Sequence, residues 1–156
     1  PEVQMRRESN IAIGQNAGKD DLIRSGNQHS ALDRKTVLVV EDISSNYLLI
    51  SAMLSKHYNL LHAVNGEQAV AMVKEYKIDL LLMDMKMPVM DGLTATAEIR
   101  KFDTNIPIVA LTAHAFESDK VAALKSGCND YLVKPVDKAR LMSVLRKYCH
   151  PSTLVL

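Results

Sequence analysis

Five polar side chains that could do chemistry together each come directly after a short apolar run. Glu41 and Asp42 follow VLVV, Asp84 follows LLLM, Thr112 follows IVAL and Lys134 follows YLV. Three neighbouring carboxylates repel one another and take up protons unless a cation lies between them. Oxygen ligands with room for water suit Mg²⁺, which can bridge a carboxylate and a phosphoryl oxygen. The set therefore predicts phosphoryl transfer to Asp84, with Lys134 and Thr112 holding the phosphoryl oxygens.

The elements that would bring these residues together alternate regularly along the chain. Apolar and β-branched runs predict strands at 36–41, 58–64, 79–84, 106–112 and 130–134. Helical spacing predicts helices at 44–57, with Ser44 as N-cap, and at 67–76, 93–102, 115–126 and 137–148. Such alternation dictates a parallel sheet with helices on both faces. We expect a flavodoxin-like doubly wound α/β fold, strand order 2-1-3-4-5, in which the strand ending at Asp84 lies in the middle.

Composition limits the classes of function. Lys and Arg number 19 against 18 Asp and Glu, a net charge of +1 that gives nucleic-acid binding no electrostatic support. The two cysteines, Cys128 and Cys149, have no CxxC spacing, so we do not expect a zinc site or a disulfide. We expect a cytoplasmic location. No apolar run reaches the roughly 18 residues of a membrane span. We expect a polar linker or disordered tail at 1–34, one domain at 35–149 and a short tail at 150–156.

Four blocks of the sequence resemble the signatures of one family. VLVVED (37–42), MDMKMPVMDG (83–92), LTA (111–113) and YLVKP (131–135) occur in the order and spacing typical of response-regulator receiver domains. NYLLISAML (46–54) and GCNDYLVKPVD (127–137) are most similar to receivers fused to hybrid sensor histidine kinases, although Ile43 stands where that branch commonly has Asn. The parent of such a receiver can be anchored in the inner membrane.

The resemblance implies a role for each site residue. Asp84 is the expected phosphoacceptor, and Mg²⁺ is the expected cofactor. The metal would be bound by Asp42, by Glu41 largely through water, by Asp84 and by the backbone carbonyl of Lys86. The partner would be a phosphohistidine-bearing helical domain, either of a histidine kinase or of a separate phosphotransfer protein.

The resemblance also implies a conformational switch. Thr112 and Tyr131 match the family's switch pair, in which the hydroxyl moves toward the phosphoryl oxygen and the aromatic ring turns inward. The peptide bond between Lys134 and Pro135 would be cis, a form whose free-energy cost is small only before proline. For this fragment we expect a self-phosphorylating acceptor rather than an enzyme.

Alternative interpretations remain at several positions. Thr112 could N-cap the next helix, Tyr131 could be core packing, and Lys86 and His114 could flank the pocket as ordinary exposed side chains. His29 lacks a helical phosphorylation box and is not expected to be a phosphodonor. Alternative functions are a stand-alone response regulator, a degenerate receiver that only binds, or an aspartyl-phosphate phosphohydrolase. In the last of these, the position of Lys86 usually carries a second acid.

Overall fold

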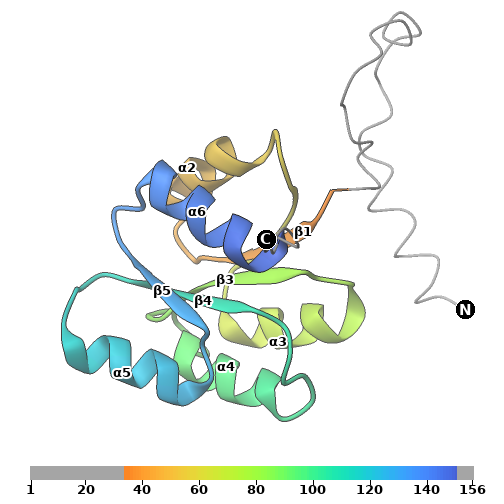
Figure 1. The fold of residues 1–156 in the computed structure, drawn as a ribbon. Coiled ribbons are helices and arrows are strands. Elements are labelled where there is room, and N and C mark those ends of the chain that lie inside the picture. Colours follow the sequence, from red (N-terminus) through yellow and green to blue (C-terminus); the bar gives the residue numbers. More distant parts are fainter. Residues whose placement is uncertain (1–33, 151–156) are drawn as a thin grey trace, which may run out of the picture. The chain divides into compact units, whose positions relative to one another are not determined.

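The computed structural model describes residues 34–150, which fold as five alternating strands and helices (Figure 1). The strands are β1 (Thr36–Val40), β2 (Asn59–Ala63), β3 (Leu80–Asp84), β4 (Ile108–Thr112) and β5 (Asp130–Val133). The helices are α2 (Ser44–Leu54), α3 (Gly66–Glu75), α4 (Gly92–Arg100), α5 (Glu117–Ser126) and α6 (Lys138–Cys149). Nearly all of the predicted linker at 1–34, including His29, and of the tail at 150–156 falls outside the described residues, so the domain boundaries stay a prediction.

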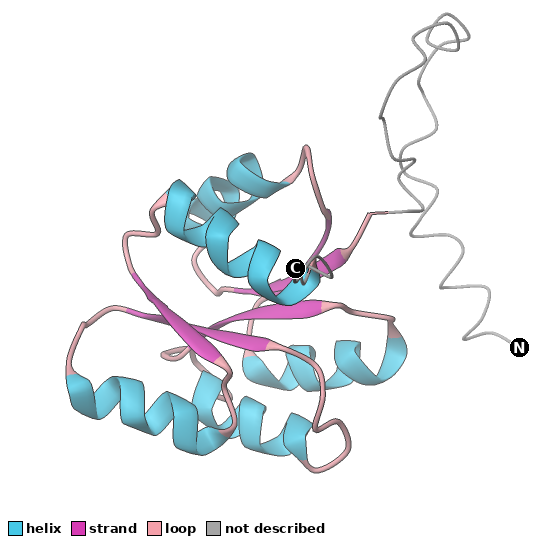
Figure 2. Cartoon of the chain, in the orientation of Figure 1, coloured by secondary structure: helices cyan, strands magenta, loops and turns pink. Residues whose placement is uncertain are grey.

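The five strands form one parallel sheet in the order β2-β1-β3-β4-β5. This confirms the flavodoxin-like order and puts β3 in the middle. Figure 2 shows the strands in magenta between the cyan helices. Every strand residue of β3 and β4 is buried, as expected of strands covered by helices on both faces. All predicted elements are present, and their ends differ from the predicted ones by at most three residues.

The sheet separates two apolar layers, which Figure 1 shows as helices above and below it. Residues of β1 alternate between them: Val37 and Val39 pack with α2 and α6, while Leu38 and Val40 pack with α3, α4 and α5. Each fully buried Val or Leu side chain contributes roughly 1.5–3 kcal/mol. The packing on both faces therefore fixes the strand register, and with it the positions of the polar residues that follow each strand.

Side chains cap three of the five helices. Asn65, Asp91 and Asp137 each accept a hydrogen bond from a backbone N–H in the first turn of α3, α4 and α6. The prediction of Ser44 as the N-cap of α2 is wrong, because Ile43 occupies the cap position and makes no side-chain hydrogen bond there. Ser44 is the first residue of the helix itself, so its hydroxyl lies one position beyond the cap.

Within residues 34–150, no helix combines the length and the apolar character that crossing a membrane requires.

Candidate functional site

The strand register brings the predicted site residues to one edge of the sheet. Val40 pairs with Met83, so Glu41 lies level with Asp84 on the neighbouring strand. On the other side, Asp84 pairs with Leu111, which puts Thr112 one residue farther along. Because parallel strands end at the same edge, side chains that are far apart in sequence meet there.

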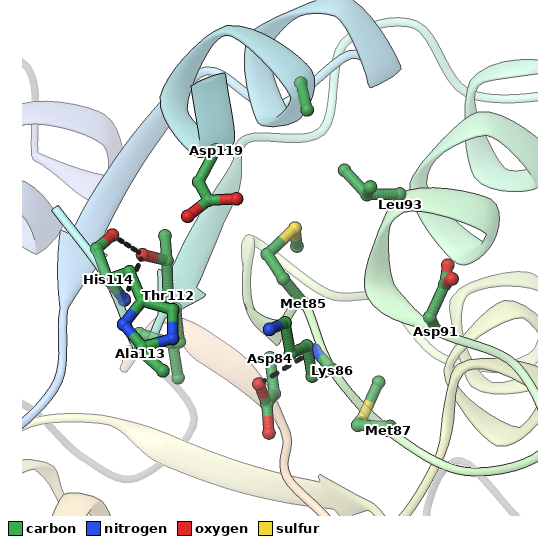
Figure 3. Close-up of a pocket in the computed structure, with 12 residues that line it drawn as sticks. Asp84, Met85, Lys86, Met87, Asp91, Leu93, Thr112, Ala113, His114 and Asp119 are labelled. Carbon is green, nitrogen blue, oxygen red and sulfur yellow. Dashed lines mark hydrogen bonds between the residues drawn. The ribbon is translucent and has the colours of Figure 1, made fainter. Parts of the chain in front are cut away.

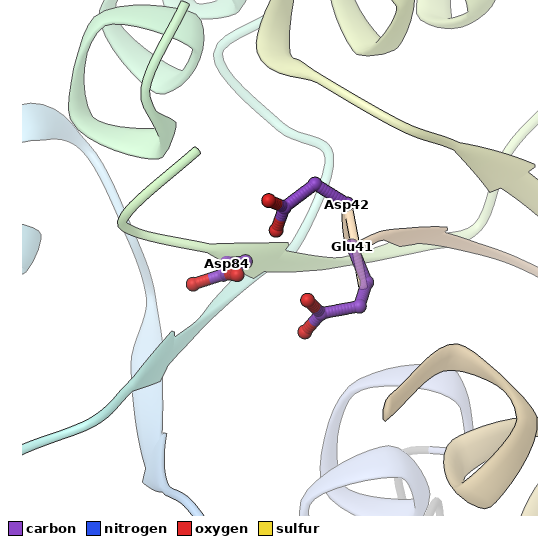
Figure 4. Close-up of side chains that lie close together, drawn as sticks. All are labelled: Glu41, Asp42 and Asp84. Carbon is purple, nitrogen blue, oxygen red and sulfur yellow. The ribbon is translucent and has the colours of Figure 1, made fainter. Parts of the chain in front are cut away.

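Three carboxylates gather at this edge (Figure 4). Oxygens of Glu41, Asp42 and Asp84 all lie within 4.8 Å of one another. Glu41 is completely buried and Asp84 is 5 % exposed, whereas Asp42 is only partly buried. Backbone N–H groups also contribute: the amide of Ile43 donates to Glu41 Oε1 at 3.2 Å and that of Lys86 to Asp84 Oδ1 at 3.2 Å. We call Glu41, Asp42 and Asp84 the acidic cluster.

Lys134 bridges two members of the acidic cluster. Its Nζ lies 2.8 Å from Glu41 Oε2 and 3.1 Å from Asp84 Oδ2, although Lys134 directly follows β5, which is two strands away from β3. Burial disfavours the ammonium, but the hydrogen bonds to the two carboxylates outweigh it and raise the pKa of Lys134. Lys134 therefore stays charged, and its stem spans the gap that strand spacing predicts.

The pKa values of the two buried acids, Glu41 and Asp84, shift in opposite directions. Burial tends to raise the pKa of Glu41, yet the hydrogen bonds from Lys134 and from the Ile43 amide lower it overall. For Asp84 burial is the larger effect, so its pKa is raised despite Lys134, and the charge of Glu41 raises it further. The two acids also affect each other in opposite directions, because a hydrogen bond with Asp84 lowers the pKa of Glu41 while the charge of Glu41 raises that of Asp84. Ionised Asp84 is thus the member of the pair that most needs additional positive charge.

The donor set fits a hard divalent cation. One ammonium neutralises only one of the three carboxylates, and no ion pair within residues 34–150 involves Asp42. Asp42 is partly exposed, so a metal held there could keep water ligands, as Mg²⁺ prefers. Among the described residues, this is the one group of His, Cys, Asp and Glu side chains close enough to hold a metal ion.

Thr112 lies at the end of β4 and is 4 % exposed. Its hydroxyl donates to the carbonyl of His114 and accepts from the His114 amide at 3.2 Å. The alternative that Thr112 caps the next helix is wrong, because Phe116 occupies the N-cap position of α5. Both hydrogen bonds are inside the β4–α5 loop, so the hydroxyl must give up the His114 carbonyl to reach a group on Asp84.

Beside Asp84 lies a cavity of about 390 Å³ between the β3–α4 and β4–α5 loops (Figure 3). Lys86 and His114, which the sequence suggested as flanking residues, both line it. Met85 and Met87 line it too, and both pack against the core cluster on the α3–α5 side of the sheet. The cavity gives an incoming group access to a carboxylate that is otherwise almost buried.

The remaining predicted residues lie around this centre. The Lys134–Pro135 peptide bond is cis. Tyr131 is half-buried on β5, outside the acidic cluster and next to the α3–α5 layer.

Two supporting residues were missed from the sequence. His62 at the end of β2 has its Nε2 2.8 Å from the carbonyl oxygen of Glu41 and stacks on Tyr47 with ring centroids 3.7 Å apart. Gly92 leaves no room for a side chain, since a Cβ there would lie 2.2 Å from the carbonyl oxygen of Asp84. A usable signal for His62 was its polar ring among the apolar residues Leu60, Leu61 and Ala63. A usable signal for Gly92 was its place directly after Met90 and Asp91, at the start of a predicted helix.

A doubly wound sheet with a buried carboxylate, an acidic pair and a lysine at its carboxyl edge defines a class of α/β module suited to phosphoryl transfer. The family model of the response regulator receiver domain matches residues 37–146. The chain belongs to this family, the receiver domains of two-component phosphorelays.

Relatives agree with this assignment. Hybrid signal transduction histidine kinase M of Dictyostelium discoideum is 40% identical over 119 residues, which are 71% of this chain but 5% of that protein. The receiver domain of sensor histidine kinase PA1611 from Pseudomonas aeruginosa, solved with magnesium in its active site cleft, is 39% identical with a TM-score of 0.70. The match covers 74% of this chain and 97% of that one.

A second similar structure is a complex. The receiver domain of the Saccharomyces cerevisiae response regulator Ssk1, crystallised with the histidine phosphotransfer protein Ypd1, is 37% identical with a TM-score of 0.71. The match covers 74% of this chain and 88% of that one.

Proposed function

We propose that Asp84 accepts the phosphoryl group, with Lys134 and the acidic cluster preparing it for attack. The observation that carries this proposal is the Lys134 ammonium bridging Glu41 and Asp84 at 2.8 and 3.1 Å. A lysine that merely covered the surface would not reach a completely buried glutamate. An ammonium at that point can hold a phosphoryl oxygen once the group has been transferred to Asp84.

The transfer is an in-line displacement at phosphorus. A carboxylate oxygen of Asp84 forms the new O–P bond while the N–P bond of a phosphohistidine breaks, and the released imidazole nitrogen keeps the electron pair. Mg²⁺ held by Asp42, Glu41, Asp84 and the carbonyl of Lys86 would neutralise charge on the transferring group. The Lys86 amide, which donates to Asp84 Oδ1, orients the carboxylate so that its other oxygen stays beside Lys134.

Thr112 and Tyr131 complete the proposal as the residues that respond. Phosphorylation offers the Thr112 hydroxyl a charged acceptor in exchange for the neutral carbonyl of His114. The loop that carries His114 then shifts, and the ring of Tyr131 turns inward. Charge-assisted hydrogen bonds are about twice as strong as neutral ones, so the Thr112 hydroxyl should prefer the phosphoryl oxygen to the His114 carbonyl.

The proposed donor is a phosphohistidine on a helical domain of a histidine kinase or phosphotransfer protein. The Ssk1 complex with Ypd1 supports this kind of partner. The resemblance to receivers implies docking on the loops around Asp84 and on α2, and the exposure of Leu48 and Leu49 of that helix, 62% and 50%, fits such a contact. The chain spans only 5% of the hybrid kinase reported above, so a hybrid sensor histidine kinase as parent is likewise our proposal, with a stand-alone response regulator as the alternative.

Intact-mass measurement tests the acceptor. The chain is incubated with Mg²⁺ and a small acyl phosphate, and we expect one phosphoryl mass gain in the wild type and none in Asp84→Asn. Asp91→Asn is the matched control, since Asp91 also lines the cavity but its Oδ1 accepts from the Thr94 amide at 2.7 Å. A wild type that stays unmodified, or an Asp84→Asn variant that is still modified, would overturn the proposal.

The alternative of an aspartyl-phosphate phosphohydrolase has its own test. Such enzymes need an acid to protonate the leaving group, and at the expected position the chain has Lys86, on the cavity wall. We therefore expect no multiple turnover of a generic phosphate ester. Asp84-dependent turnover would instead favour the hydrolase.

A further inference from the structure

Helix α5 is weakly anchored to the body of the domain. Ala123 is its one fully buried residue, while Val121 and Leu124 are 39% and 49% exposed. The other helices each bury at least two residues. Specific polar contacts therefore carry more of the attachment of α5 than they do elsewhere in the fold.

The C-terminal end of α5 has such a contact. Arg100 of α4 donates from Nε to the carbonyl of Gly127 at 3.0 Å and from Nη2 to Asn129 Oδ1 at 2.9 Å. Gly127 is the left-handed C-cap of α5, with φ of 114°. One guanidinium thus ties the end of α5 to α4 and to the start of β5.

The N-terminal half of α5 has a different contact. The Nζ of Lys120 lies 4.8 Å from the centroid of the Tyr131 ring, in the range of a cation–π interaction. Both residues are half-buried, so solvent screens the pair less than it would on an open surface. Tyr131 belongs to the same apolar layer as α5. No other cation lies over this ring within the part of the chain that the structure describes.

We propose that Lys120 is a positioning residue that latches the Tyr131 ring in its resting orientation and so raises the cost of the phosphorylated state. This inference rests on the proposed function, in which the ring turns inward when Asp84 carries a phosphoryl group. An inward ring leaves the ammonium, so the cation–π energy is present in the resting state and absent in the switched one. A phosphoryl analogue that prefers the switched state should therefore bind more weakly to the protein with the Lys120–Tyr131 contact than to a variant without it.

The sign of the effect separates this role from simple electrostatics. If Lys120 acted only as a positive charge in the field around the site, its removal would weaken the binding of an anion to Asp84. If Lys120 is a latch, its removal strengthens that binding. Cation–π pairs are worth about 0.5–1 kcal/mol at partly exposed sites, which converts to a two- to five-fold change in affinity.

The test uses beryllofluoride with Mg²⁺, a non-covalent analogue of the phosphoryl group, titrated into the full chain. Lys120→Met keeps the apolar stem and loses the charge, Lys120→Arg keeps a cation over the ring, and Lys125→Met removes the same charge from an exposed position on α5. We expect two- to five-fold tighter binding for Lys120→Met and wild-type binding for Lys120→Arg. Lys125→Met should bind as the wild type or slightly more weakly. Unchanged or weaker binding by Lys120→Met would overturn the latch.

A spectroscopic readout follows the latch directly. In the resting protein the ring current of Tyr131 should shift the ε-methylene protons of Lys120 upfield in NMR spectra, and beryllofluoride should abolish that shift. An upfield shift that persists at saturation contradicts the inference. Failure of the underlying function looks different: Asp84 would show no phosphoryl mass gain, and beryllofluoride would not bind the wild type at all.

Discussion

Removing the Lys134 ammonium should expose how strongly the acidic cluster is held together. Lys134→Met keeps a stem of similar shape but leaves Glu41, which is completely buried, without the ammonium 2.8 Å from its Oε2. Breaking a buried pair by removing one partner typically costs 3–5 kcal/mol, because the other charge stays buried without compensation. We expect a loss in that range from the free energy of unfolding at pH 7 without divalent cation. For a domain of this size the melting temperature should fall by roughly 10–20 °C.

The loss should depend on pH with a definite sign. In the wild type the pKa of Glu41 is lowered, so its stabilising contribution is present above the pKa of the unfolded chain and disappears as the pH falls through the folded value. Without Lys134, burial is the main remaining influence, and the pKa of Glu41 should be raised. The ionised form then costs stability as the pH rises above about 4.3, the ordinary glutamate value. The difference between wild type and Lys134→Met should therefore be largest near neutrality and shrink toward pH 5.

Chemical denaturation from pH 5 to 8, with and without Mg²⁺, measures both expectations. Adding Glu41→Gln to Lys134→Met removes the stranded charge, so the double variant should recover at least half of the loss. Mg²⁺ should stabilise Lys134→Met more than the wild type, since it replaces the missing positive charge. A loss below about 1 kcal/mol that is independent of pH and of the Glu41 substitution would refute this electrostatic reasoning.

Three further predictions concern the metal, the loop and the thiols. Asp42→Asn should weaken Mg²⁺ binding about 10-fold or more by calorimetry while changing metal-free stability by less than about 0.5 kcal/mol, because no ion pair within the described residues depends on Asp42. Gly92→Ala should destabilise the domain by roughly 1–3 kcal/mol in urea unfolding, because its Cβ would lie 2.2 Å from the Asp84 carbonyl oxygen; unchanged stability would contradict that close approach. Cys128 and Cys149 are buried, and burial raises the pKa of Cys149 to about 11, so a disulfide reagent at pH 8 should react with neither thiol until the protein is denatured.

The fold could be predicted from sequence because its determinants are local and repeated. Runs such as 80–83 are apolar on both faces, as in a strand that helices cover on both sides, and each run is followed by a helical pattern. The acidic cluster followed from the same pattern, since parallel strands end at one edge and Asp84 ends the middle strand. Helix ends were less predictable. Ser44 has the preferred side chain for an N-cap, yet the chain turns into α2 one residue earlier.

Contacts that depend on side-chain direction could not be read from the sequence. Nothing in the order of residues says that His62 contacts the carbonyl of Glu41, or that Lys120 lies over the ring of Tyr131. The same holds for the backbone at Val89, which has a positive φ of 69°, unusual for a β-branched residue. There the Met90 amide donates to the carbonyl of Pro88 at 2.8 Å, so a tight turn in the loop beside Asp84 overrides the preference of valine.

The charge arrangement bears on how Asp84 could act as the acceptor that we propose although it is almost buried. Burial raises the pKa of Asp84, and the charge of Glu41 raises it further, so its ionised form is less stabilised than that of Glu41. Lys134 contacts both Glu41 and Asp84, at 2.8 and 3.1 Å, so a single ammonium is shared by two buried carboxylates. Asp84 would therefore gain from added positive charge, and a divalent cation beside Asp42 would supply it and lower the pKa of Asp84. On this reasoning the phosphorylation that we propose should need both the Lys134 ammonium and a divalent cation, because one ammonium shared by two acids leaves a third carboxylate uncompensated.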